Sequence, residues 1–377
     1  MLVCRVAYPG TWGCCPTSIQ RVYDFMVVPL ASFPNSVSAA THHLAVLDEN
    51  RVTGQRIGRI ISAAANFSPV VVSDDVGEIE QALGHHDGLL CCDARDVRAG
   101  IEVSKRADAK LLVWTRGPLT AEVEAALEQA SVDSVVAWPD FLSVPRPWEL
   151  SMAVRRALNP RAVPRARDLL SWGASMFKWR PRSTEDRDRV VAEVGDWMRT
   201  LSLAPRQVER ITEVTYELVM NAMYDAPVDA QGRPRYAFDR QKPIQLSEVE
   251  APAVRLGSDG LLLVVEVTDP FGLLSRSHVM RCLLRGRRAA ETAEGEVVDA
   301  SHGGAGLGLF KVYSSSAAML TEVHHKQLTR VLSVHDLDVS PRELRTLPCS
   351  LHLFDVPPSH DRTPTSPGYV SPGEMMA

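Results

Sequence analysis

The stretch "ELVMNAMYDA", residues 217–226, has the apolar spacing of a helix, yet it places a carboxylate, Glu217, one turn before an amide, Asn221. The expected buried stripe of this helix, about residues 206–224, consists of Ile211, Val214, Leu218 and Ala222. A polar row runs beside it at intervals of four, through Glu213, Glu217, Asn221 and Asp225. Taken alone, such a row is more simply explained by a solvated helix face than by a binding site, because polar faces are what helices usually have. Asn is nevertheless a poor residue inside a helix, because its side chain competes for backbone hydrogen bonds.

Two segments further along the chain also carry groups suited to binding. The strand-like run "VVEVTDPFG", residues 264–272, leads to Asp269, whose carboxylate can accept a hydrogen bond from the exocyclic amine of a purine. An ordinary Asp-Pro turn is the plainer interpretation. "HGGAGLGLFKV", residues 302–312, is rich in glycine and opens a helix, where backbone N–H groups favour phosphate oxygens. A flexible loop with a packed glycine explains it equally well, and it is neither a dinucleotide fingerprint nor a Walker loop.

Together and in this order, the three segments resemble the ATP-binding domain shared by gyrase, the Hsp90 chaperone, histidine kinases and MutL, known as the Bergerat fold. "ELVMNA" resembles its N box, "DPFG" its first glycine box and "GGAGLGL" its second. The resemblance covers about residues 175–340 and implies an α+β sandwich that binds ATP and Mg²⁺. It departs from the family at the first glycine box, where Phe271 and Leu273 stand in the usual glycine positions. That departure implies a reshaped adenine pocket.

The resemblance also implies a role for each motif residue. Asn221 would hold a Mg²⁺ ion between the phosphates, since a hard cation takes oxygen ligands, and Glu217 would orient or deprotonate the attacking hydroxyl. Asp269 would bind the adenine amine, helped by Thr329 on a late strand. The other nucleotide contacts would come from Asp225, Gly272, Gly304, Gly306 and Gly308. Residues 276–302 would form a mobile ATP lid, with "RCLLRGRRAAETAEGEVVDA" as a charged loop.

Upstream, five short apolar runs alternate with segments of helical spacing. The runs are "HLAVLD", "SPVVVSD", "GLLCCDA", "KLLVWTR" and "VDSVVAWP". This alternation predicts a doubly wound parallel sheet with helices on both faces. It resembles a response-regulator receiver domain, whose site needs acids after the first strand, Asp after the third, Ser or Thr after the fourth and Lys after the fifth.

The ends of the predicted strands hold most of that receiver constellation. Asp48 and Glu49 follow the first predicted strand and Asp93 follows the third. Thr115 follows the fourth strand and Trp138 the fifth. Asp93 would be the phosphoacceptor, but Trp138 stands where the resemblance expects the Lys, so charge on a phosphoryl group would be less well stabilised. Three interpretations stay open: a degenerate receiver, an active receiver, and an unrelated doubly wound domain with acidic strand ends.

The predicted fold class is therefore α/β, a five-strand parallel receiver-like domain followed by an α+β sandwich of the Bergerat type. The expected boundaries are a poorly ordered extension at 1–42, the receiver-like domain at 43–158, a Pro- and Arg-rich linker at 159–168, the ATP-binding domain at 169–355 and a disordered tail at 356–377. Within the second domain we expect a helix with Thr184 as its N-cap. We also expect a hairpin in residues 252–269 and a last strand in "SLHLFDV", residues 350–356.

Composition narrows the class of protein further. The 377 residues are 45% hydrophobic and 23% charged with a net charge of −5, which is typical of a globular protein and argues against nucleic-acid binding. We find no apolar run of the roughly 18 residues that a membrane-spanning helix needs and no signal peptide, so we expect a cytoplasmic protein. The 7 cysteines have no C-x-x-C spacing, which favours reduced buried thiols.

The segment before the expected ATP-binding domain indicates which class of Bergerat-fold protein the chain resembles. No histidine lies between residues 87 and 277, so a histidine kinase would have no phosphoacceptor there. The lead-in "FKWRPRSTEDRDRVVAEV" resembles anti-sigma-factor serine kinases, which phosphorylate a Ser of an antagonist protein and also sequester a sigma factor. We expect an ATP-dependent protein serine/threonine kinase, regulated by its receiver-like domain, with an antagonist or sigma factor as partner and a homodimer as one assembly. The alternatives are a non-catalytic ATP-dependent binding switch and an adaptor whose receiver-like domain mediates dimerisation.

Overall fold

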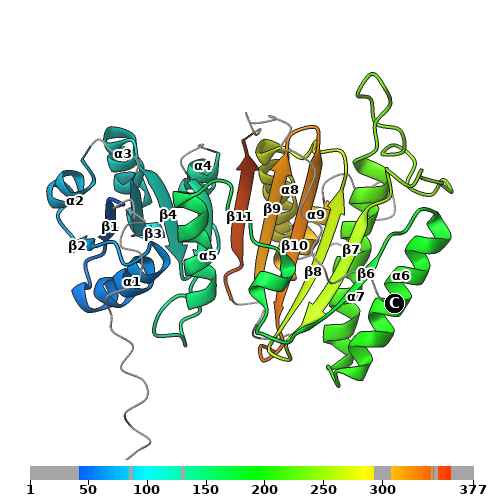
Figure 1. Ribbon diagram of the computed structural model, residues 1–377, viewed down its shortest axis with the longest axis horizontal. Coiled ribbons are helices and arrows are strands. Elements are labelled where there is room, and N and C mark those ends of the chain that lie inside the picture. The colour runs from blue at the N-terminus through cyan, green and yellow to red at the C-terminus, as the bar shows by residue number, and fades with distance from the viewer. Residues whose placement is uncertain are drawn as a thin grey trace, which may run out of the picture. The chain divides into compact units, whose positions relative to one another are not determined.

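Five parallel strands alternate with five helices in the first half of the computed structural model (Figure 1). The strands are β1 (Leu44–Leu47), β2 (Val70–Ser73), β3 (Leu89–Asp93), β4 (Lys110–Thr115) and β5 (Val132–Ala137). The helices are α1 (Arg51–Ala64), α2 (Val76–Leu83), α3 (Val97–Ala107), α4 (Ala121–Leu127) and α5 (Pro147–Leu158). The spatial order is β2-β1-β3-β4-β5. In a doubly wound sheet of this order, ligands bind at the carboxyl ends of the strands, where the winding reverses between β1 and β3.

The structure describes residues 42–84, 88–128, 132–292, 307–340, 343 and 347–357. Nearly all of the expected N-terminal extension and C-terminal tail, Gly304 and Gly306, and the second part of the expected lid lie outside these ranges. Among the described residues, none of the helices combines the length and the apolar character that crossing a membrane requires.

The second half of the chain forms a mainly antiparallel sheet covered by helices. Its strands are β6 (Ser175–Trp179), β7 (Ala253–Ser258), β8 (Leu262–Asp269), β9 (Ala318–His324), β10 (Leu328–Asp336) and β11 (Ser350–Val356), in the order β11-β9-β10-β8-β7-β6. The helices are α6 (Thr184–Thr200), α7 (Pro205–Met220), α8 (Arg276–Thr292) and α9 (Leu307–Ser314). The predicted fold class is confirmed as a parallel α/β part followed by an antiparallel sheet with helices.

Apolar side chains fill both faces of the antiparallel sheet. On one face, alternate residues of β8 such as Leu263 and Val265 join the buried residues of α6 to α9 in a single core. The opposite face, with Val264, packs against Leu169 and Leu170 of the segment between α5 and β6. The Pro- and Arg-rich segment expected as a linker therefore leads into residues that cover the sheet.

Three local predictions need correction. Residues 281–292, expected as a charged loop, belong to α8, because Val279, Met280, Cys282 and Leu283 bury one side of a helix in the core. The N-cap of α6 is Ser183, whose hydroxyl accepts from Asp186 N at 3.1 Å, while the expected cap, Thr184, accepts from Ile244 N. Strand β6 was not predicted, because its residues are largely exposed and show no apolar alternation.

Strand β11 joins the two halves into one sheet of 11 strands. It runs parallel to β9 and antiparallel to β5, so it lies between them (Figure 1). Buried polar groups fix this junction: His352 contacts Ser134 Oγ and Glu149 Oε1, each at 3.0 Å, and Ser350 Oγ accepts from Ala137 N at 2.7 Å. An unpaired polar group would be costly at this depth, so these bonds specify the register of β11.

We predict that Ser350→Ala lowers the free energy of unfolding by about 1–3 kcal/mol, because it leaves the buried Ala137 N–H without its acceptor. Urea denaturation of the full chain measures this change. Ser314→Ala, at an exposed position near the end of α9, is the matched control and should lie within about 0.5 kcal/mol of the parent. Equal stability of the two variants would contradict the role given to Ser350.

Candidate functional site

The helix that carries the polar row changes its hydrogen bonding at Asn221. Helix α7 ends at Met220 and continues as a π-helical turn over Asn221–Asp225, in which Ala226 N donates to Asn221 O at 2.9 Å. Such π-turns occur frequently at functional sites. The expected apolar stripe is indeed buried, through Ile211, Val214, Leu218 and Ala222. Asn221 and Asp225, in contrast, line a pocket.

Gly308, in the first turn of α9, packs against the polar row of α7. A Cβ atom at this position would lie 2.6 Å from Glu217 Oε2 and 3.7 Å from Asn221 Oδ1. A side chain at residue 308 would have to displace the end of the Glu217 side chain, so glycine allows α9 to meet α7 with Glu217 in this position. The structure thus brings the end of the glycine-rich segment to the "ELVMNA" helix. Gly304 and Gly306 lie outside the described residues, and the binding roles of all three glycines stay predictions.

Asp269 and Thr329 occupy the side of the pocket formed by the sheet. They are paired across the antiparallel strands β8 and β10, and both line the pocket. Phe271 N donates to Asp269 Oδ1 at 2.9 Å. Burial raises the pKa of Asp269 from 3.8 to about 6, although hydrogen bonds from Phe271, Gly272 and Thr329 oppose the rise. A carboxyl group with so perturbed a pKa, at the wall of a pocket, is typical of binding and catalytic sites.

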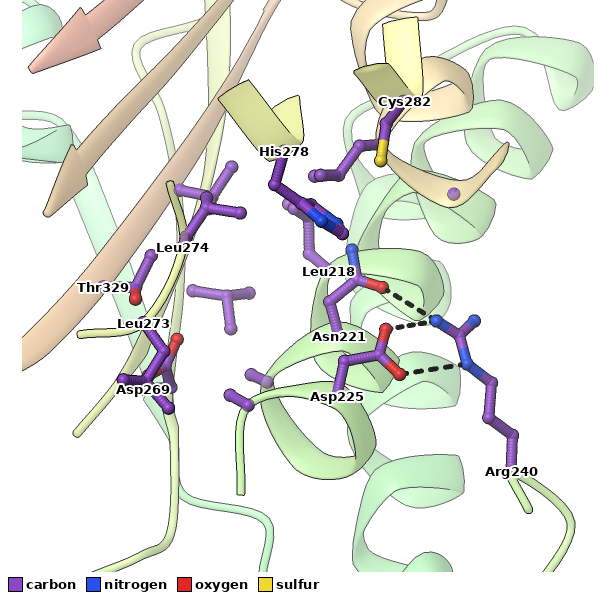
Figure 2. A pocket seen from close by; sticks show the side chains of 16 residues that line it. Leu218, Asn221, Asp225, Arg240, Asp269, Leu273, Leu274, His278, Cys282 and Thr329 are labelled. Atoms are coloured by element: carbon purple, nitrogen blue, oxygen red, sulfur yellow. Dashed lines mark hydrogen bonds and ion pairs between the residues drawn. The ribbon is translucent and has the colours of Figure 1, made fainter. Parts of the chain in front are cut away.

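Figure 2 shows the pocket between these two sets of polar groups, with Asp269 and Thr329 across from Asn221 and Asp225. Its apolar walls include Leu218, Ala222, Val267, Leu273, Leu274, Leu309 and Val331. An apolar cleft with a few converging polar groups is the usual form of a small-molecule site. Leu273, which stands where the resemblance expects glycine, is part of this wall, so the departure seen in the sequence does reach the pocket.

Three further residues of the pocket escaped the sequence analysis. His278 and Cys282 reach it from α8, and burial lowers the pKa of His278 while it raises that of Cys282. Arg240 reaches it from the irregular segment between the π-turn and β7. Its Nε donates to Asp225 Oδ1 at 3.3 Å and its Nη2 lies 3.4 Å from Asn221 Oδ1 (Figure 2). No periodicity or motif marks residues 226–252, so no local pattern pointed to Arg240.

Glu217 stands beside this pocket, half-buried between α7 and α9. Burial raises its pKa, while the positive charges of Lys311 and Arg240 lower it. Lys311 itself forms an ion pair with Glu213 at 3.2 Å. A carboxylate with a raised pKa is a stronger base than an exposed one, which is what proton abstraction from a hydroxyl requires.

Gly272 has a role in packing rather than in lining the pocket. Its φ is +64°, and a Cβ atom there would lie 2.1 Å from His324 O. Lys326 N donates to Gly272 O at 3.0 Å. The residue therefore holds the segment after β8 against the β9–β10 turn, and it is absent from the residues that line the pocket. This placement gives no support to the nucleotide contact expected of Gly272.

The magnesium ion that the resemblance implies at Asn221 stays a prediction. Within the described part of the chain, no cluster of three or more His, Cys, Asp or Glu side chains is arranged to bind a metal. Mg²⁺ commonly takes only one or two protein oxygens and completes its shell with water and phosphate oxygens. The amide oxygen of Asn221, which the resemblance assigns to the metal, accepts a hydrogen bond from Arg240 Nη2 at 3.4 Å.

A second pocket lies at the carboxyl ends of the parallel strands. Most of the residues expected there from the receiver resemblance converge, since Asp48, Asp93, Thr115 and Trp138 line it. Glu49, the second acid expected after the first strand, is exposed and does not line the pocket. Both oxygens of Asp93 are engaged: Arg95 Nε lies 3.0 Å from Oδ1, and Trp114 Nε1 lies 3.2 Å from Oδ2. These bonds hold the carboxylate in place.

Arg116 places a positive charge near the position of the missing Lys. Its guanidinium lies 3.8 Å from the centroid of the Trp138 ring, a cation–π contact. It also lies 3.8 Å from Asp140. Trp138 and Asp140 together orient the Arg116 guanidinium. This positive charge comes from the segment after β4, whereas the resemblance expects a lysine after β5.

Comparison with solved structures gives distant similarities, with four matching chains. No protein-family model and no curated protein sequence matches the chain. The crystal structure of the SiaB–SiaC complex from Pseudomonas aeruginosa is similar over 42% of this chain and 88% of its own, at 15% sequence identity and a TM-score of 0.26. A similarity of that size carries no conclusion about function.

We predict that Asp269→Asn removes a pH-dependent cost to stability. Because the folded pKa, about 6, lies above the unfolded one, the neutral form stabilises the fold at low pH, and this contribution is lost as the pH rises through 6. The stability of Asp269→Asn relative to the parent should rise by about 2 kcal/mol between about pH 4.5 and pH 8. Chemical denaturation at several pH values measures it, and a difference that does not vary with pH would contradict the raised pKa.

Proposed function

We propose that the chain is an ATP-binding signalling protein that transfers a phosphoryl group to a serine of a partner protein, in the manner of anti-sigma-factor serine kinases. The single observation that supports this most is the contact of Gly308 with Glu217 and Asn221 at one side of a pocket whose other side holds Asp269 and Thr329. Adenine would bind at Asp269, and the phosphates would bind at Asn221 and the N-terminal end of α9.

Each group has a defined part in the proposed transfer. The carboxylate of Glu217 would take the proton of the serine hydroxyl as its oxygen bonds to the γ-phosphorus, and the bond from that phosphorus to the bridging oxygen would break to release ADP. Mg²⁺ held by Asn221 would neutralise charge on the phosphates. Asp269, as a carboxylate, would accept a hydrogen bond from the adenine amine, with Thr329 beside it.

A binding switch that does not transfer phosphate is the second candidate, and a specific observation favours it. Leu273 lines the pocket at a position where the resemblance expects glycine, so the adenine end of the pocket differs from that of the family. Such a protein would bind ATP and change its affinity for a partner, here an antagonist or a sigma factor. An adaptor that dimerises through the receiver-like half is a third form of the same proposal.

We predict that Mg²⁺-ATP raises the melting temperature of the parent protein by several degrees, as about 3 kcal/mol of ligand stabilisation would at 100 times the dissociation constant. Asn221→Ala should abolish this shift. Glu217→Gln should retain the shift but lose transfer of labelled phosphate to serine in an extract of the native cell. A parent protein with no shift would contradict the proposal, while a shift without transfer would leave the binding switch.

Helix α8 gives a physical route by which the receiver-like half would regulate this site. Arg276 donates to the backbone oxygens of Leu127 at 3.0 Å and Leu353 at 2.9 Å, and Arg287 donates to Leu119 O at 2.8 Å and Glu124 Oε2 at 2.9 Å. The two arginines stand about three helical turns apart and so share one face of α8.

The opposite face of α8 lines the pocket. His278 and Cys282 are one turn apart and lie about half a turn around the helix from the arginines. A shift of α4 would therefore move α8 and, with it, one wall of the nucleotide pocket. We propose that the receiver-like half acts on the nucleotide site through this contact between α4 and α8.

We predict that Glu124→Gln weakens ATP binding by about fivefold or more, because it loosens the contact between α4 and Arg287 that positions α8. Arg287→Gln should weaken binding to the same extent, and the double variant no further. Glu122→Gln, on the same helix but in an exposed ion pair with Arg98, is the matched control and should bind as the parent does. Calorimetric titration decides, and equal affinity of Glu124→Gln and Glu122→Gln would contradict the route.

A further inference from the structure

We propose that Arg240 is the phosphate-binding cation of the nucleotide site. This inference rests on the proposed function, because it assumes that the pocket takes an adenine nucleotide. It adds a residue that belongs to none of the three sequence motifs. Arg240 would exchange part of its contact with Asp225 for the charged oxygens of the bound polyphosphate, and it would set the preference of the pocket for di- and triphosphates over nucleosides.

The charges of the pocket call for such a residue. Its lining includes two carboxyl groups, Asp225 and Asp269, and Glu217 stands beside it. A nucleotide polyphosphate brings further negative charge. Among the described residues that line the pocket, Arg240 is the one with a permanent positive charge, since burial lowers the pKa of His278. Lys311, the basic residue of α9, is already paired with Glu213 at 3.2 Å.

The position of the guanidinium fits this role. Its Nη2 donates to Asn221 Oδ1, the atom assigned to the metal, at 3.4 Å. With a metal ion on that oxygen, the guanidinium would give up this hydrogen bond and would lie within reach of a phosphate oxygen that shares the ion with Asn221. The side chain is partly buried, with 21% of its surface exposed, and in such surroundings a charged hydrogen bond is stronger than at the open surface. A guanidinium can also bind carboxylate and phosphate oxygens at the same time through its five donors.

The backbone around Arg240 is held in place, so the side chain and not the segment would adjust. Tyr224 OH donates to Lys242 O at 3.0 Å, and Ile244 N donates to Thr184 Oγ1 at 3.0 Å. Leu246 N donates to Arg182 O at 2.7 Å. These bonds anchor the chain shortly after Arg240 to α6 and the π-turn, which fixes the distance from its Cα to the pocket.

A purely local role for Arg240 makes a different prediction. If the guanidinium only neutralises Asp225, whose pKa is raised by burial and lowered by Arg240, its loss would disturb the pocket for every ligand. A phosphate contact, in contrast, is lost only by ligands that carry phosphate. The Asp225→Asn background separates the two roles. Loss of Arg240 in that background leaves no unpaired carboxylate at residue 225 to repel the ligand.

The test compares adenosine, ADP and ATP by calorimetric titration with Mg²⁺ on the full chain. In the Asp225→Asn background, adding Arg240→Gln should weaken ATP and ADP binding by about 10- to 100-fold and change adenosine binding by less than about twofold. Arg233→Gln, on the same segment but in an exposed pair with Asp229 outside the pocket, is the matched control and should change none of the three affinities. Thermal melting of each variant confirms that it is folded.

The failure of this inference and that of the proposed function are distinguishable. A parent protein that binds none of the three ligands overturns both. A parent that binds ATP, with Arg240→Gln leaving the ratio of ATP to adenosine affinity unchanged, overturns the role of Arg240 alone. A loss confined to ADP and ATP supports it.

Discussion

The close approach of α9 to α7 at Gly308 is the contact on which the site depends. With no side chain at this position, the start of α9 comes against Glu217 and Asn221, and a single methyl group would collide with the carboxylate. This contact places a helix N-terminus, an amide and a carboxylate around one point. The π-turn that begins at Asn221 places Asn221 and Asp225 at the pocket, where the buried side chains of Leu218 and Ala222 form part of its apolar wall. The polar row on α7 is therefore explained by the start of α9, which packs against Glu217 and Asn221.

Much of the fold could be predicted because its signals are local. The five apolar runs of the parallel half, the hairpin before Asp269 and the apolar stripe of α7 each follow from spacing within a short window. The convergence of Asn221, Asp269 and Gly308 could be predicted only through the family resemblance. Nothing in the spacing of separate segments says that they meet, and their binding roles remain a proposal.

The features that escaped prediction are set by contacts distant in sequence. Helix α8 is rich in arginine and resembles a charged loop in sequence. Arg276 and Arg287 donate hydrogen bonds to carbonyl and carboxylate oxygens of the parallel half, and these distant contacts stabilise the segment as a helix. The sequence of β11 predicts a strand, but not its place between β5 and β9. That place depends on hydrogen bonds of Ser350 and His352 to Ala137 and Ser134, more than a hundred residues earlier in the chain. Arg240 lies in a segment without periodicity, and only tertiary structure brings it to Asp225.

The central claim is that one adenine nucleotide spans the pocket from Asp269 to Asn221. A crystal structure of the protein grown with Mg²⁺ and a non-hydrolysable ATP analogue tests it most directly. We expect the adenine amine within hydrogen-bond distance of the Asp269 carboxylate, and the metal on the amide oxygen of Asn221 with the phosphates at the N-terminal end of α9. An analogue bound elsewhere, or bound with its phosphates turned away from Asn221 and Gly308, would contradict the claim.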